Sequence, residues 1–196
     1  MAKIITIARE CGAAGSTIGR AVADRLGFEY YDKALILKAA KEAGTNVEEV
    51  LDWDEKVPVD FGFAQSLFNI KSRPQSERLY EIQKDVIRSM GDQGDCVIVG
   101  RNANVVLKEY EHCLKVFLYA DESWRVEWMR QSHSEMSEEE VRAEIKSVDK
   151  NRKKYCSYFT ETQMQEAVNY DLCLKVSAIG IEQCVDTICR VISEMS

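Results

Sequence analysis

Five short apolar runs, separated by stretches with helical periodicity, constrain the fold of this chain more than any other feature of its sequence. Apolar runs of this kind are typical of strands buried on both faces of a sheet. Strands that alternate with helices favour parallel pairing, because each helix carries the chain back across the sheet. The runs are "KIITIA" (3–8), "FEYYD" (28–32), "CVIVG" (96–100), "LKVFLYA" (114–120) and "DLCLKV" (171–176). We therefore expect an α/β fold whose parallel sheet is covered by helices on both sides.

Two of the intervening stretches have a clear amphipathic pattern. The stretch 16–26 places Ile18, Val22 and Leu26 on one face of a helix, at positions i, i+4 and i+8. The stretch 181–195 has a wider apolar face, made by Ile181, Cys184, Val185, Ile188 and Ile192. Both stretches are predicted to be helices that pack on the sheet.

Length and charge limit the class of protein. A chain of 196 residues is expected to form a single domain. Its 26 basic and 33 acidic residues give a net charge of −7, which argues against non-specific binding to nucleic acid. The N-terminal apolar run is too short for a signal peptide, and no stretch approaches the roughly 18 apolar residues of a membrane span. We expect a cytoplasmic protein with small-molecule partners, neither nucleic acid nor membrane, and find no signal for an oligomeric state.

The cysteines occur singly, with no C-x-x-C pair. Neither His112 nor His133 lies at zinc-ligand spacing from two cysteines. Several of the cysteines fall inside apolar runs, where a free thiol behaves as a small core residue. The sequence therefore predicts reduced thiols, without a disulfide or metal framework, at Cys11, Cys96, Cys113, Cys156, Cys173, Cys184 and Cys189.

Two segments interrupt the alternation of strands and helices. Residues 33–93 are mostly helical in pattern but include 57–78, which has the Pro and Gly content of a loop. Residues 121–168 are dense in charge, and a capping box of Ser137 and Glu140 predicts the start of a helix there. Both segments are expected to be arms on one core, which consists of residues 1–32, 94–120 and 169–196.

The stretch "RECGAAGSTIG" (9–19) joins the first strand to the first helix. A small-residue turn at this place is typical of a phosphate-binding loop, whose pattern is G-x-x-x-x-G-K-[ST]. In that frame Gly15 stands at the lysine position, Ser16 at the hydroxyl position, and Thr17 follows. The missing positive charge can come from Arg9 or from other arginines. The alternative is a glycine-rich turn that only packs the helix against the strand.

Polar residues follow the second and third strands. Asp32 and Lys33 come after the second, and Gly100 with Arg101 after the third. Ligands of open α/β sheets bind at the carboxyl edge of the strands, where these residues are expected. An arginine at this edge is poorly explained by packing and suits a fork around phosphate. For Asp32, the cap of a following helix is an equally good explanation.

Basic residues gather near the third quarter of the chain. Arg125 and Arg130 are five positions apart on a helix that begins near residue 122, so they are expected on different sides of it. "DKNRKKY" (149–155) adds Arg152 and a run of lysines. The simplest interpretation of the lysines is a solvated helix face, formed by Lys146, Lys150, Lys153 and Lys154.

In combination these stretches resemble the cytidylate kinase-like branch of the P-loop nucleoside monophosphate kinases. The resemblance rests on residues 5–36, "DEKVP" (54–58), "QGDCVIVGRNANVVL" (93–107), "VDKNRKKYCSYF" (148–159) and "NYDLCL" (169–174). It implies a three-layer P-loop fold with a central five-stranded parallel sheet, a helical insert at about 33–93 that binds the monophosphate, and a lid at about 121–168. It also implies phosphoryl transfer from ATP, with Mg²⁺, to a nucleoside monophosphate such as CMP or dCMP.

The resemblance assigns roles to individual residues. Asp32 and Arg101 would lie beside the acceptor monophosphate, and Ser16 or Thr17 would bind the metal. Asp149 would orient one of the arginines. The donor phosphates would be held by Gly12, Ala13, Ala14, Gly15, Ser16 and Thr17, and the transferring group would be neutralised by Arg125, Arg130 and Arg152. Arg9 is a further catalytic candidate, because it can supply the charge that the loop lacks.

The sequence departs from the branch at several positions. The loop has no lysine, and Ala13 and Ala14 replace the usual Ser and Gly. Ser16 stands where the branch often has Arg, and Asn102 where cytidylate kinases have Asp. These departures motivate two alternatives: a nucleotide-binding regulatory protein with little catalytic activity, and a kinase of another small acceptor.

Overall fold

A computed structural model describes residues 2–32, 34, 75–132 and 134–195 of the chain. At its centre is a five-stranded sheet with the strand order β2-β3-β1-β4-β5, in which all neighbouring strands are parallel. The five predicted runs form these strands, and the predicted parallel sheet is confirmed. The strands are β1 (Ile4–Arg9), β2 (Glu29–Tyr31), β3 (Cys96–Val99), β4 (Cys113–Tyr119) and β5 (Leu172–Lys175).

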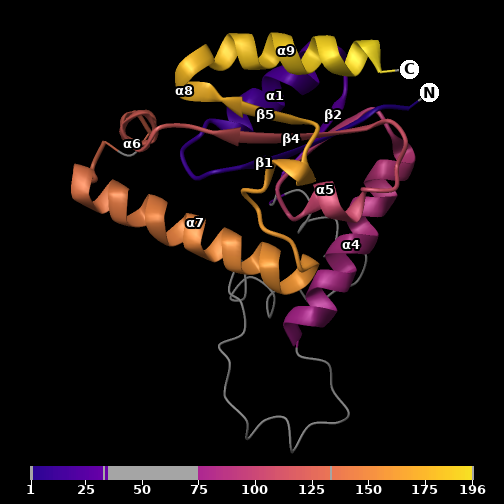
Figure 1. Cartoon of the computed structure of the whole chain (residues 1–196), viewed down its shortest axis with the longest axis horizontal. Helices are drawn as coiled ribbons and strands as arrows, with labels where there is room; N and C mark the ends of the chain where they lie inside the picture. Colours follow the sequence, from indigo (N-terminus) through magenta and orange to yellow (C-terminus); the bar gives the residue numbers. More distant parts are fainter. Residues whose placement is uncertain (1, 33, 35–74, 133, 196) are drawn as a thin grey trace, which may run out of the picture.

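Helices cover both faces of the sheet, which gives the expected three layers (Figure 1). One face carries α1 (Gly15–Leu26) and α9 (Ile181–Glu194), and the other carries α4 (Gln75–Gln93) and α5 (Ala103–Val106). The remaining elements are α6 (Glu122–Arg130), α7 (Glu138–Thr160), the 3-10 turn η1 (Ala167–Asn169) and α8 (Val176–Ile179).

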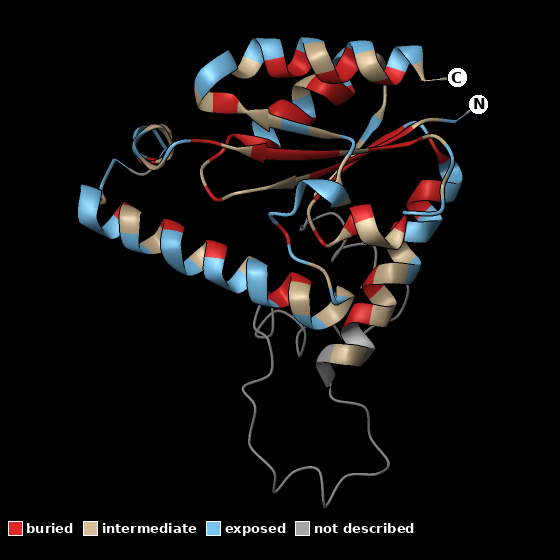
Figure 2. Cartoon of the chain, viewed as in Figure 1, coloured by how far each residue is buried: buried red, intermediate tan, exposed pale blue. Residues whose placement is uncertain are grey.

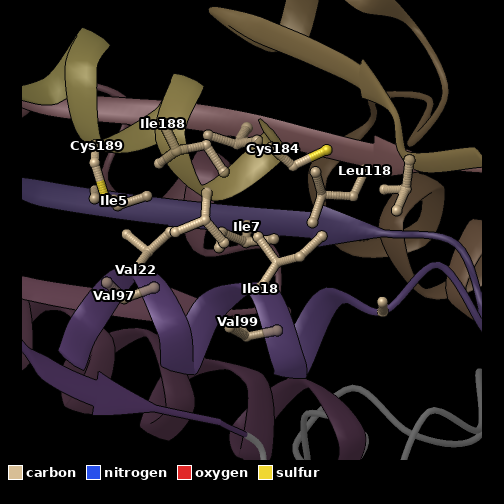
Figure 3. Packing of buried hydrophobic residues seen from close by; sticks show 14 of the residues in the cluster. Ile5, Ile7, Ile18, Val22, Val97, Val99, Leu118, Cys184, Ile188 and Cys189 are labelled. Atoms are coloured by element: carbon tan, nitrogen blue, oxygen red, sulfur yellow. The ribbon is translucent and has the colours of Figure 1, made fainter. Parts of the chain in front are cut away.

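Alternation along the central strands divides the core into two. Ile5 and Ile7 of β1 pack against α1 and α9, together with Val97 and Val99 of β3 (Figure 3). The intervening residues of the same strands, among them Ile98, face α4 and α5. The strands are accordingly buried along most of their length, whereas α9 is buried only on its inner side (Figure 2). This two-sided burial explains why the strands read as continuous apolar runs.

The helix predictions agree with the structure. The amphipathic stretches become α1 and α9, and α7 begins with the predicted capping box. There the Glu140 amide donates to the Ser137 hydroxyl at 3.3 Å, while the Ser137 amide donates to the Glu140 carboxylate at 2.8 Å. The expectations for Lys33, for 54–58 and for most of 57–78 lie outside the described residues. Within the described ranges, no helix is both long and apolar enough to cross a membrane.

The cysteines are all free thiols. Six of the seven are buried and Cys173 is exposed, which agrees with the expectation of reduced thiols in the core. Burial raises the pKa of Cys96 to about 12 and of Cys184 to about 11. No group of three or more His, Cys, Asp or Glu side chains that suits a metal ion occurs in the described part of the chain.

We expect one thiol, Cys173, to react with a disulfide reagent in the folded protein, because the thiolate is the reactive form and the other thiols are buried. Titration with Ellman's reagent should count one reactive thiol at neutral pH and seven after unfolding in guanidinium. A Cys173→Ser variant should show none while folded. Two or more equally fast thiols in the native protein would contradict the burial of the others.

Candidate active site at the carboxyl edge of the sheet

The loop between β1 and α1 presents uncapped backbone amides. Ala14, in the left-handed region at φ 53°, is the N-cap residue of α1 and provides no side-chain hydrogen bond. The first amides of a helix have no intrahelical partner, so the amides of Gly15, Ser16 and Thr17 are available to an anion. The side chains of Ser16 and Thr17 are exposed beside them. The start of α1 is therefore suited to bind phosphate.

The two alanines of the loop do not obstruct it. Ala13 and Ala14 are 0% and 6% exposed, and both belong to the hydrophobic core beneath α1 and α9. Their methyl groups therefore pack into the core. Gly12, at φ 75°, lies where a Cβ atom would be 3.1 Å from the Cβ and carbonyl oxygen of Arg125. The loop keeps its glycine where α6 approaches the backbone.

Arg9, the last residue of β1, extends across the start of α1. A Cβ atom on Gly15 would lie 2.6 Å from Arg9 Cγ and 3.0 Å from its Cβ. At the far end of the side chain, a Cβ atom on Gly100 would collide with Arg9 Nη1 and lie 3.0 Å from Cζ. The arginine thus runs from the end of β1, over the first residue of α1, to the residue that follows β3.

A pocket opens at this edge of the sheet, and three arginines line it. Arg9 comes from β1, Arg101 from the turn after β3 and Arg152 from α7. Arg152 Nη1 also donates to the carbonyl oxygen of Arg9 at 3.3 Å. The rest of the lining is formed by small, amide, aromatic and sulfur-containing residues: Ala8, Gly100, Asn102, Asn104, Tyr155, Cys156, Met164 and Tyr170. The pocket therefore combines a positively charged part with an aromatic and apolar part.

An unusual turn carries Arg101 into this pocket. Gly100, Arg101 and Asn102 have φ angles of 86°, 60° and 53°, so three consecutive residues adopt left-handed conformations. Each non-glycine residue in this region costs of order 1–3 kcal/mol, and such strain is concentrated at functional sites. Arg101 is only 6% exposed and Asn104 only 7%. The turn holds a buried charged group at the carboxyl edge.

A carboxylate braces the loop against α6 and α7. Asp149 Oδ1 accepts from the Cys11 amide at 2.7 Å, and its Oδ2 accepts from Arg125 Nη1 at 2.6 Å. Arg125 also donates to the Cys11 carbonyl oxygen at 3.2 Å and lies 3.8 Å from the Glu10 carboxylate. The predicted orienting role of Asp149 thus falls on Arg125. We call these four residues the Asp149 brace.

Two contacts of the loop were not predicted from the sequence. Glu10 accepts a hydrogen bond from Gln165 Nε2 at 2.9 Å and one from the Ala120 amide at 3.4 Å. Glu10 thereby joins the loop to the end of β4 and to the segment after α7. No local pattern marks Gln165, because its partner lies 155 residues earlier in the chain.

Cys11 packs in the core that α6 and α7 share. Its Sγ atom lies 3.8 Å from Met129 Sδ, and burial raises the pKa of the thiol above its usual value. A thiol that stays protonated at neutral pH is a poor nucleophile. Cys11 therefore packs the loop against α6 and α7.

Two predicted site residues are not joined to the pocket by the contacts described. Asp32 follows β2 at the same edge, but it accepts from the Ala34 amide at 3.0 Å and from Arg20 Nη2 at 3.2 Å. The bond to Ala34 agrees with the capping alternative. Arg130 is exposed near the end of α6, whereas the Arg125 side chain is 11% exposed, so the two arginines lie on different sides as their spacing predicts.

Residues 4–178 match the model of the cytidylate kinase-like family. The chain belongs to this family. The match spans the loop, the arginine-bearing turn, the brace and β5, and it confirms the resemblance found in the sequence. A comparison with curated protein sequences finds no match.

Solved structures share the fold of this family member. An uncharacterized protein from Eubacterium ventriosum superimposes with a TM-score of 0.76 at 20% identity, over 98% of this chain and 99% of that chain. A shikimate kinase from Bacteroides thetaiotaomicron gives a TM-score of 0.57 at 14% identity, over 98% and 99%. A shikimate kinase from Acinetobacter baumannii, in complex with shikimate, gives 0.54 at 12%, over 100% and 97%. At these identities the likeness shows the fold, which the chain shares with these shikimate kinases.

Proposed function

We propose that this member of the family transfers the terminal phosphoryl group of ATP to a nucleoside monophosphate, with CMP and dCMP as the first acceptors to test. The convergence of Arg9, Arg101 and Arg152 on one pocket carries the proposal. To catalyse phosphoryl transfer, a protein mainly has to position the two substrates and to supply positive charge around the transferring group. Guanidinium groups from three separate elements supply that charge beside the loop.

The two parts of the pocket suit the two parts of such an acceptor. Arg101, buried on its strained turn, would bind the acceptor phosphate through paired N–H donors. Tyr155 and Tyr170 give the apolar part the aromatic surface on which a nucleobase stacks. Tyr155 is fixed by the hydrogen bond that its hydroxyl donates to Gln83 of α4 at 2.9 Å. A nucleobase in the pocket would thus stack on a tyrosine ring that is held in place.

The start of α1 suits the donor phosphates and their metal. The methyl groups of Ala13 and Ala14 lie in the core and do not obstruct the first turn, whose residues Ser16 and Thr17 are exposed. The exposed hydroxyl of Ser16 or Thr17 would bind Mg²⁺. When bound, the metal neutralises part of the charge on the donor phosphates.

An acceptor screen tests the proposal. ADP release from ATP and Mg²⁺ is measured with CMP, dCMP, UMP, AMP, GMP and shikimate as acceptors. We expect turnover with at least one pyrimidine monophosphate. ATP binding by calorimetry without ADP release from any acceptor would favour a nucleotide-binding regulatory protein, and turnover with shikimate alone would favour a kinase of another small acceptor.

Arg101→Ala should lower kcat/KM for the acceptor by roughly 10- to 100-fold, because it removes a charge-assisted contact to the acceptor phosphate. The loss is expected in KM, while the affinity for ATP stays unchanged. Arg190→Ala, which removes an exposed arginine of α9, is the matched control and should behave as wild type. Unchanged acceptor kinetics in Arg101→Ala would remove Arg101 from the acceptor site.

A further inference from the structure

We infer that Arg9 is the cation of the phosphate loop, in place of the lysine that the loop lacks, and that residue 15 is glycine because the Arg9 side chain occupies the space that a larger residue would need. The inference rests on the proposed function, since it assigns Arg9 to the phosphates of the donor. According to this inference, the Arg9 side chain and a side chain at residue 15 cannot occupy their positions at the same time.

The packing of the arginine stem on Gly15 is the first support. A Cβ atom on Gly15 would lie 2.6 Å, 3.0 Å and 3.3 Å from Cγ, Cβ and Cδ of Arg9. Real Cβ atoms do not approach carbon atoms within 3.0 Å, so any side chain at residue 15 displaces the arginine. Gly15 is also buried, and its φ lies outside the left-handed region, so backbone conformation does not demand glycine there. The position of the Arg9 stem therefore explains why residue 15 is glycine.

The position of the guanidinium is the second support. Its Nη1 and Cζ atoms lie against Gly100, at the start of the turn that carries Arg101. The stem therefore lies over the helix start that suits the donor phosphates, and the charged end lies in the acceptor pocket. A group that passes from donor to acceptor passes the Arg9 guanidinium. The lysine of the usual loop spans the donor phosphates in the same way.

The base of the arginine is rigid. Arg9 is level with Leu118 in the pairing of β1 and β4, and its carbonyl oxygen accepts from Arg152 Nη1 at 3.3 Å. A catalytic group held at a strand end keeps its geometry better than one on a loop. The charge that the loop lacks at residue 15 is thus supplied six residues earlier, from the sheet itself.

A four-protein comparison tests the exchange: wild type, Arg9→Ala, Gly15→Lys and the double variant Arg9→Ala/Gly15→Lys. The affinity for ATP with Mg²⁺ is measured by calorimetry, and kcat by ADP release with the best acceptor. Arg9→Ala should lower kcat by roughly 100-fold and weaken ATP binding by roughly 10-fold. Gly15→Lys should lose activity and melt at a lower temperature, because the lysine collides with Arg9.

The double variant shows whether a lysine at residue 15 can replace Arg9. Arg9→Ala removes the Cγ and Cδ atoms at 2.6 Å and 3.3 Å and leaves only the Cβ at 3.0 Å, a contact that a shift of a few tenths of an ångström relieves. We therefore expect kcat and ATP affinity to recover at least tenfold over Arg9→Ala. The melting temperature should recover over Gly15→Lys. A folded double variant, by circular dichroism, that is no better than Arg9→Ala in either measurement would overturn the inference, as would wild-type kcat and ATP affinity in Arg9→Ala.

The two proposals fail in different ways. If wild type binds ATP but releases no ADP with any acceptor, the proposed function fails. The ATP affinities of the four proteins then still show whether a lysine at residue 15 can replace Arg9 in ATP binding. If ATP does not bind to wild type, both proposals fall. Arg190→Ala again serves as the control with unchanged affinity.

Discussion

Replacing Asp149 with alanine should lower the free energy of unfolding by about 3 kcal/mol, because it removes the closest carboxylate of the nearly buried Arg125 guanidinium and leaves only the Glu10 carboxylate at 3.8 Å. The Arg125 and Asp149 side chains are 11% and 12% exposed, and their atoms are 2.6 Å apart. The same substitution removes the acceptor of the Cys11 amide. Arg125 Nε already has no hydrogen-bond partner among the described residues, so the guanidinium would retain only the Cys11 carbonyl oxygen at 3.2 Å and the Glu10 carboxylate at 3.8 Å.

Urea denaturation measures this loss, and an exposed ion pair provides the control. Glu138 and Arg142 of α7 are similarly close, at 2.7 Å, but their side chains are 49% and 37% exposed. Surface pairs contribute little, so Glu138→Ala should leave the urea midpoint nearly unchanged. If Asp149→Ala and Glu138→Ala shifted the midpoint equally, the Asp149 brace would not stabilise the packing of α6 and α7 on the loop.

Arg152→Ala should lower kcat by roughly 10²- to 10³-fold while the KM of the acceptor changes less than about threefold. Arg152 comes from α7, lines the pocket and donates to the Arg9 carbonyl oxygen, so it lies beside the arginine that we propose to span donor and acceptor. Charge placed there stabilises the transferring group more than the bound ground state. The signature is the opposite of that expected for Arg101→Ala, which acts on KM.

Steady-state kinetics with the acceptor varied at saturating ATP distinguishes the two arginines. Lys153→Ala, on an exposed neighbouring residue of the same helix, is the matched control and should leave both constants unchanged. A rise in KM with an intact kcat in Arg152→Ala would move this arginine from the transferring group to the acceptor.

The fold was largely predictable because its signals are local. Buried strands and amphipathic helices can be recognised from patterns within a few residues, such as the spacing of Ile18 and Val22 in α1. The capping box of α7 lies within four residues for the same reason. The sides of α6 on which Arg125 and Arg130 lie also followed from the helical period.

The sequence predicted the three arginines that line the pocket, but it did not predict their contacts. That Gly15 occupies the lysine position is visible in the sequence, but the packing of the Arg9 stem on it depends on how β1 enters α1. The Asp149 brace joins residues that are 24 and 138 positions apart, so no spacing rule reveals it. Likewise, only the packing of α1 on the sheet shows that the Ala13 methyl group leaves the loop accessible.

The central claim is that three arginines surround the phosphates between donor and acceptor. A crystal structure with a bisubstrate analogue, adenosine and cytidine joined by five phosphates, tests it most directly. We expect the phosphate chain to run from the start of α1 into the pocket, with Arg9, Arg101 and Arg152 within hydrogen-bond distance of it. A phosphate chain bound at α1 but directed away from the pocket, with no contact to these arginines, would contradict the claim.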